Sequence, residues 1–156
     1  MKRHTFERTD IWREGEWVDL WSIVHFLSGV LLGFCLHILH YGASASVLLA
    51  LLLLIIYEMW EAMMKIEETP ANRFMDVVVG MASFVPTFFL LIPQLSQTTS
   101  ILVFGVVLVV DGVLSTAGWR ASQKASELRQ RVHTKFEIER TKLRKQKTRL
   151  RKRFRR

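Results

Sequence analysis

Ionisable side chains occur within stretches of this sequence that are otherwise apolar. His25 lies in the first stretch, Glu58 and Glu61 end the second, and Asp76 and Asp111 lie in the third and fourth. Imidazole and carboxylate groups are common general acids and bases in enzymes. We therefore expect His25 and Glu58 to exchange protons with a substrate, with Asp76 as a third catalytic residue.

A second set of polar residues is expected to hold the substrate. Asn72 and Asp76 are four residues apart, as are Asp111 and Ser115, so each pair shares one side of a helix. The residues expected to bind substrate are Glu61, Asn72, Arg73, Asp111 and Ser115.

A divalent metal is an alternative ligand for this layer of residues. Hard oxygen donors and imidazole both bind such ions, and His25, Glu58 and Asp76 would be the donors. The sequence contains no compact metal motif such as HExxH, so the cofactor stays open.

The same residues also have purely structural interpretations. Glu61 could pair with Lys65 four residues later, and Asp76 could pair with Arg73 or cap a helix. Glu58 has no basic residue three or four positions away, which favours a functional role for it.

The elements that must position these residues are apolar runs of about 20 residues, long enough as helices to cross roughly 30 Å of hydrocarbon. A soluble helical bundle is disfavoured, because "ILVFGVVLVVDGVLSTAGW" has no polar face. We predict an all-α fold, a four-helix transmembrane bundle, with helices over 21–40, 45–64, 73–92 and 99–119.

Charge is divided unevenly along the chain. Residues 120–156 hold 16 Lys+Arg and 3 Asp+Glu, a net charge of +13, whereas the rest of the chain carries −5. The links "YGAS" and "PQLSQT" carry no Lys or Arg. Because basic segments stay in the cytoplasm, both termini are expected there, in an integral membrane protein of the bacterial inner membrane.

This topology places the ionisable groups in one layer. From the helical rise they lie roughly 4–12 Å deep in the cytoplasmic leaflet. Intramembrane ionisable groups normally face the bundle interior. Gly29 and Gly33 form a small-xxx-small pair that permits close helix approach.

The segment before the bundle, residues 1–20, is expected to lie on the membrane surface as an amphipathic lead-in. Tryptophan prefers the membrane interface. The tryptophans assigned to that interface are Trp12, Trp17, Trp21, Trp60 and Trp119. Pro86 is expected to kink the third helix and to open space beside Asp76.

The basic tail, 120–156, is expected to form a cytoplasmic helix. A thin apolar stripe follows it, comprising Leu128, Val132, Phe136, Leu143, Leu150 and Phe154. The tail could bind anionic lipid headgroups, assemble a homo-oligomer as a coiled coil, or bind nucleic acid. Lipid binding and retention in the cytoplasm are the favoured interpretations.

Two segments, "VDLWSIVHFLSGVLLG" and "YEMWEAM…ANRFMDVVVG", together resemble the small four-helix VanZ-like integral membrane proteins over residues 19–83. The matching positions are Asp19, His25, Glu58 or Glu61, Arg73, Asp76 and Gly80. The asparagine usual between the last Asp and Gly of this pattern is a valine here, and the basic tail is not part of it. The resemblance implies an envelope or lipid-related role.

Two functions from different classes follow. One is a polar site in the cytoplasmic leaflet that binds or processes a lipid headgroup or a lipid-linked envelope intermediate. The other is a homo-oligomeric channel or membrane-perturbing effector with the tail as its assembly or sensing segment. A lipid site needs polar groups that converge within one chain, whereas a channel needs them arrayed around a symmetry axis.

Overall fold

The structure is a computed structural model that describes residues 11–13, 15, 17–64 and 69–153. Its elements are α1 (Leu20–Ile38), α2 (Ala43–Met63), α3 (Pro70–Pro86), the π-helical η1 (Thr87–Leu91), the 3₁₀ segment η2 (Ile92–Gln94) and α4 (Gln97–Arg153). The described part contains no strand, and four helical spans are long and apolar enough to cross a membrane. The predicted all-α transmembrane bundle is confirmed.

The helices begin slightly before the apolar runs used to predict them, and at α1 and α3 a polar cap fixes the start. Asp19 caps α1: its side chain accepts from the Trp21 N–H at 2.7 Å, and the Ser22 hydroxyl accepts from the Asp19 N–H. Thr69 caps α3, whose first residue is Pro70. Proline is suited to the first helical position because no hydrogen bond needs its missing N–H there.

The chain divides into two compact units. One unit is residues 9–120, which contain the bundle, and the described residues of the other belong to α4 after Arg120. The second unit is helical as far as Arg153, and its side chains Leu128, Phe136 and Leu143 are exposed. The stripe residue Phe154 and the side chain of Leu150 lie outside the described residues.

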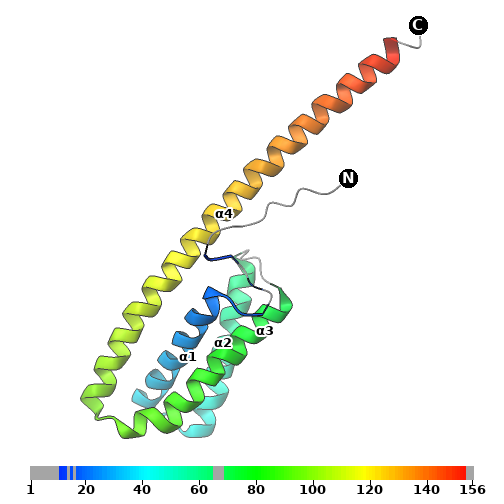
Figure 1. Cartoon of the computed structure of the whole chain (residues 1–156). Coiled ribbons are helices and arrows are strands. Elements are labelled where there is room, and N and C mark those ends of the chain that lie inside the picture. The colour runs from blue at the N-terminus through cyan, green and yellow to red at the C-terminus, as the bar shows by residue number, and fades with distance from the viewer. Residues whose placement is uncertain (1–10, 14, 16, 65–68, 154–156) are drawn as a thin grey trace. The chain divides into compact units, whose positions relative to one another are not determined.

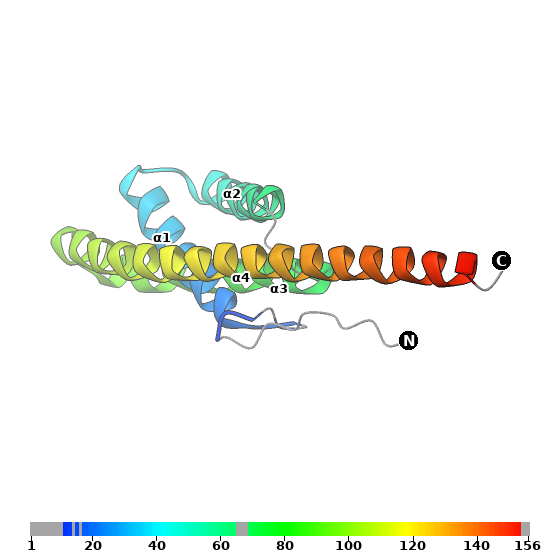
Figure 2. The same cartoon turned by 90° about the horizontal axis from the view of Figure 1, so that it is seen from above.

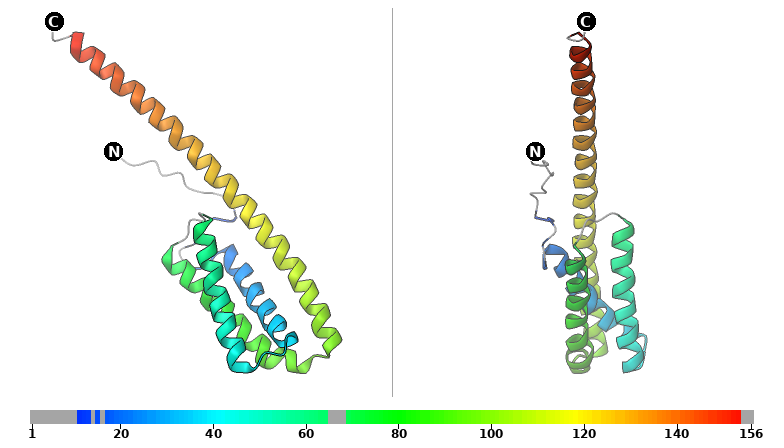
Figure 3. Two further views of the ribbon diagram at one scale, coloured as in Figure 1. Left: turned by 180° about the vertical axis from the view of Figure 1, so that it is seen from behind. Right: turned by 90° about the vertical axis from the view of Figure 1, so that its right-hand side faces the viewer.

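Within the bundle, α1 occupies the central position. Figures 1–3 show it crossing α3 obliquely, with its C-terminal end near α2, and both α2 and α3 contact it. The closest contact is with α3, because a Cβ at Gly29 would overlap the Gly80 carbonyl oxygen. Ser83 fastens this contact by donating a hydrogen bond to the Phe26 carbonyl oxygen at 2.7 Å. The close approach predicted for the glycine pair is therefore confirmed.

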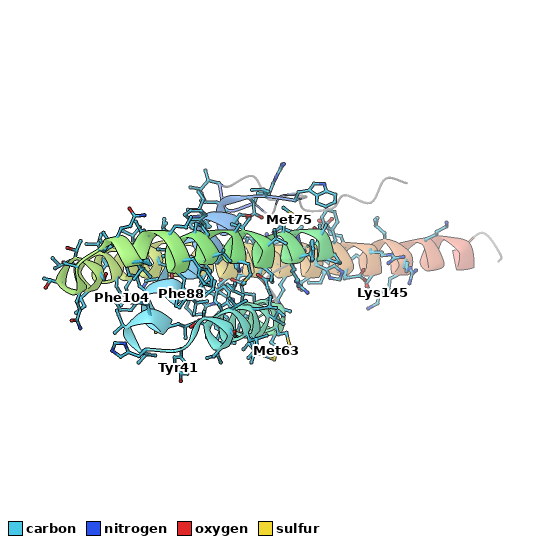
Figure 4. All side chains as sticks on the ribbon, turned by 90° about the horizontal axis from the view of Figure 1, so that it is seen from below. Tyr41, Met63, Met75, Phe88, Phe104 and Lys145 are labelled. Carbon is cyan, nitrogen blue, oxygen red and sulfur yellow. The ribbon has the colours of Figure 1, made fainter. Side chains whose placement is uncertain are left out.

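The end of the bundle that holds the α1–α2 turn is apolar. Leu36, Ala50, Phe84 and Phe88 form its core, and in Figure 4 Tyr41 lies at the outer side of the turn. Pro86 ends α3, and the chain continues in the wider π-helical η1. Because Pro86 follows Asp76 by ten residues, about 15 Å along a helix, this change acts at the apolar end. That it opens space beside Asp76 stays a prediction.

The outer faces of the helices are apolar and exposed, as contact with lipid requires. Burial within the protein is lowest in α2 and α4, at 22% and 6% of their apolar windows, against 44% for α1 and 39% for α3 with its extension. A water-soluble protein rarely exposes apolar surface of this extent. Most of α2 and of the apolar part of α4 is thus suited to contact with lipid.

The lead-in differs from the surface segment that we expected. Its described residues before α1 are not helical, and residues 1–10, 14 and 16 lie outside the description. Trp12 is buried and packs edge-on against Trp21, with ring centroids 5.3 Å apart. Both rings contact Gly118 of α4. These two tryptophans thus fill the protein interior, whereas the exposed Trp17, Trp60 and Trp119 are free to contact the membrane interface.

We predict that Gly29→Ala lowers bundle stability by about 1–3 kcal/mol, as overpacking does, because the new methyl group meets the α3 backbone. Gly105→Ala is the matched control, since a Cβ there meets nothing within 4 Å. The midpoint of thermal unfolding in detergent, monitored by size-exclusion chromatography of the heated samples, is compared between the two variants and the wild type. Equal midpoints for both variants would contradict the proposed close contact.

Candidate functional site

The centre of the polar layer is the imidazole of His25 on α1. Its side chain is fully buried. Nδ1 lies 3.0 Å from the Trp21 carbonyl oxygen, one turn earlier in the same helix. Nε2 points to α2, where it lies 2.7 Å from Glu58 Oε1 and 4.0 Å from Glu61 Oε2. The ring therefore connects the first turn of α1 to the acidic end of α2.

Glu58 and Glu61 present their carboxylates from one side of α2. The two residues are three positions apart, which places them on the same helix face, and they are only 6% and 1% exposed. None of their four carboxylate oxygens makes a well-aligned hydrogen bond with a described residue, and the neutral hydroxyl of Tyr57 lies within reach of Glu61. The short contact between Glu58 and the imidazole of His25 is thus an ion-pair distance without hydrogen-bond alignment.

Asp76 of α3 lies on the other side of the imidazole and has partners of its own. Its Oδ1 accepts a 2.6 Å hydrogen bond from the Ser22 hydroxyl, and its Oδ2 accepts from Asn72 Nδ2 at 3.3 Å. Asn72 also donates to Asp19 Oδ2 at 3.1 Å, which joins this network to the cap of α1. Asp76 Oδ1 is 3.9 Å from Nδ1 of His25. Neutral donors therefore hold Asp76 beside Nδ1, and its carboxylate does not approach Nε2.

The outer members of the site come from α2 and α4. The Tyr57 ring lies 5.1 Å from that of His25 and stacks on Trp60. Asp111 of α4 is half-buried, its Oδ1 is fully buried, and it lies close enough to His25 for their charges to interact. Ser115, one turn further along α4, is also half-buried.

The structure brings together most of the residues selected from the sequence. His25, Glu58, Glu61 and Asp76 form one cluster, and Asn72 is buried beside it. Arg73 is half-buried at the start of α3. Lys65, the alternative partner of Glu61, lies outside the described residues, as do Glu67 and Glu68 of the same link.

The set of donors that could surround one metal ion differs from the set expected. His25, Glu58 and Glu61 offer donor atoms within 4.8 Å of one another. Asp76 is replaced by Glu61 in this set, because Asp76 approaches Nδ1, on the edge of the ring that faces away from the glutamates. Helical spacing placed these residues in one layer but did not determine which edge of the imidazole each would approach.

Sequence reasoning missed two residues of the site. Ser22, which donates to Asp76, is three positions before His25 and hence on the same face of α1. Tyr57 directly precedes Glu58, and its ring packs on His25. The spacing of Ser22 was a usable signal, whereas the position of Tyr57 depends on how α2 is rotated against α1.

The chain matches no protein-family model, no curated protein and no solved structure. The site must therefore be interpreted from its own geometry.

We predict that Ser22→Ala destabilises the bundle by about 1–3 kcal/mol, the cost of leaving a buried acceptor unsatisfied, because Asp76 loses its shortest hydrogen bond. Thr116→Ala is the control, since that hydroxyl donates only to carbonyls of its own helix. Thermal unfolding in detergent measures both changes. A Ser22→Ala midpoint no lower than that of Thr116→Ala would show that the serine does not support Asp76.

Proposed function

We propose that this integral membrane protein binds the headgroup of a membrane lipid, or of a lipid-linked envelope intermediate, at the polar site around His25. The observation that supports this most directly is convergence within one chain. Side chains of α1, α2 and α3 meet at one imidazole, with contacts of 2.7 Å to Glu58 and 3.9 Å to Asp76. A site that is complete within one chain is better suited to binding a ligand than to lining a pore.

The convergence also favours the lipid site over the homo-oligomeric channel. In a channel formed by several copies, the polar groups would face a shared axis and water. Here Glu61 is 1% exposed and Asp76 is fully buried, so neither is available to line a pore outside the chain.

The surroundings of the site favour a ligand that arrives from the bilayer. Tyr57 and Glu58 reach the site from α2 and Asp111 reaches it from α4, the two helices with the least burial. Lipid molecules thus lie directly outside the helices that supply the outer members of the site. The Glu58 side chain is 8% exposed and that of Glu61 is 1% exposed, so Glu58 is the glutamate nearer to the surface.

Two roles can be assigned to the residues under this proposal. His25 and Glu58 form the proton-transferring pair, because they are in contact and both change charge by binding a proton. Asp76, Ser22 and Asn72 hold the first turns of α1 and α3 together and so keep the imidazole in place. Headgroup binding requires only that His25 and Glu58 be accessible. Chemical processing of the headgroup would also require proton transfer by this pair.

We propose further that both termini are cytoplasmic, in a bacterial inner membrane, with the site in the cytoplasmic leaflet. The basic tail supports this orientation, with 16 Lys+Arg in residues 120–156. Its described side chains between Arg140 and Lys145 are exposed, as they are in polybasic segments that bind anionic lipid. Anionic lipid is therefore the proposed partner of the tail.

Topology is tested by cysteine labelling in a Cys35→Ser background. With an impermeant maleimide applied to intact cells, Gly42→Cys and Gln97→Cys are expected to react, because both positions are exposed at the ends that lie opposite the acidic site. Gln130→Cys in the tail is the control and should react only after permeabilisation. Labelling of positions 42 and 97 from the cytoplasmic side alone would overturn the orientation.

Lipid binding is tested by native mass spectrometry of protein extracted in mild detergent. We predict that Glu58→Gln raises the Kd for lipid at least about tenfold, the effect of losing roughly 1.4 kcal/mol of binding free energy, and so lowers the fraction of protein with bound lipid. The change preserves shape and removes charge. Gly105→Ala is the control, because a Cβ there meets nothing within 4 Å. Equal lipid occupancy in both variants and the wild type, at equal amounts of folded protein, would refute the lipid site.

A further inference from the structure

Around His25, two buried carboxylates face a single imidazole, so the negative charge they can carry exceeds the positive charge available to balance it. Glu58 and Glu61 are both more than nine-tenths buried, and none of their four oxygens makes a well-aligned hydrogen bond within the described part of the chain. The Tyr57 hydroxyl near Glu61 is neutral and supplies no positive charge. Buried carboxylates are retained in proteins where they are paired, protonated or bound to a metal. A single imidazole is the only basic group that contacts either glutamate among the described residues.

The hydrogen bond at Nδ1 determines what the other nitrogen can do. A backbone carbonyl can only accept, so Nδ1 of His25 carries a hydrogen and donates it to the Trp21 oxygen. In the neutral ring, Nε2 is then unprotonated, and its lone pair points toward the two glutamates. A histidine that ligates a metal usually donates its second N–H to a carbonyl or carboxylate in this way.

We propose that His25 Nε2, Glu58 and Glu61 bind one divalent transition-metal ion of the Zn²⁺ type. Tetrahedral ligand atoms about 2.0–2.2 Å from zinc stand roughly 3.3–3.6 Å from each other. The Nε2 atom is 2.7 Å and 4.0 Å from the two carboxylates, so the spacings bracket this range. Mixed imidazole and carboxylate donors favour zinc-like ions over magnesium, whose ligands are oxygen.

Three protein donors leave coordination positions open on such an ion. Zinc sites with three protein ligands bind water or substrate at the fourth position. The inference rests here on the proposed function: the open position faces a headgroup, and a phosphate oxygen is the ligand that a divalent cation would bind. The metal would thereby make an otherwise acidic site attractive to an anionic headgroup.

The test is isothermal titration of the purified, full-length protein with Zn²⁺, carried out with an affinity tag that lacks histidine. We expect one saturable Zn²⁺ per chain in the wild type, bound more tightly than Mg²⁺. Glu58→Gln and Glu61→Gln should each weaken binding by more than the 10–100-fold that loss of an outer-shell partner costs, roughly, at metal sites. Asp76→Asn should weaken binding less than either, because Asp76 lies off the Nε2 edge.

Two controls separate this site from other sources of signal. Thermal unfolding with and without Zn²⁺ shows whether each variant is folded, and only variants that keep the ion should gain stability from it. His37→Gln with His40→Gln removes the histidines at the opposite end of α1 and should leave the stoichiometry at one. Equal Zn²⁺ affinity in the wild type and both glutamate variants would overturn the proposal, and so would the absence of saturable binding.

The outcome is independent of the lipid experiment. If Zn²⁺ does not bind but lipid occupancy still depends on Glu58, the metal is refuted and the lipid site stands. If Zn²⁺ binds as described but lipid occupancy is the same in all variants, the metal site stands without the lipid function.

Discussion

The contact between the imidazole of His25 and the buried carboxylates of α2 is the interaction on which the bundle depends. An ionised carboxylate without a partner is costly in a medium of low dielectric constant. When the imidazole is protonated, the 2.7 Å approach of Nε2 to Glu58 is the closest charge compensation that the described residues offer to either glutamate. The position of α2 against α1 is therefore constrained by charge at one end, whereas apolar packing of Ala50 against Phe84 and Leu36 constrains it at the other.

The position of His25 depends in turn on the contact between α1 and α3. Gly29 and Gly80 allow the backbones to approach, and Ser83 closes the contact with a hydrogen bond to the Phe26 carbonyl. One end of the same interface carries the Ser22–Asp76 hydrogen bond. Without a hydrophobic driving force inside the bilayer, close packing and interhelical hydrogen bonds are what hold membrane helices together. The α1–α3 pair thus forms a frame on which α2 places its glutamates.

The sequence was sufficient for features that follow from composition or helical period. Apolar length predicted the four spans, and the i,i+4 spacing of Asn72 and Asp76 predicted their shared burial. Local rules could not place Trp12, because tryptophan suits both a lipid interface and a protein interior. Its burial depends on the space beside Gly118, about a hundred residues later in the chain. Local rules also could not show that Glu61, and not Asp76, lies near Nε2. That arrangement depends on how two helices are rotated about their own axes.

Trp21 links the folding of the bundle end to the chemistry of the site. Its side chain packs on Trp12 and approaches Gly118, which ties the lead-in and α4 to the first turn of α1. Its carbonyl oxygen, in the same residue, binds Nδ1 of His25. The Asp19 cap fixes that turn by accepting from the Trp21 N–H. The direction in which Nε2 points is consequently set by Trp21, which is itself held by contacts with Trp12, Gly118 and Asp19. An imidazole with this support loses little orientational freedom when it binds a proton or a metal ion, so more of the interaction free energy is available for binding.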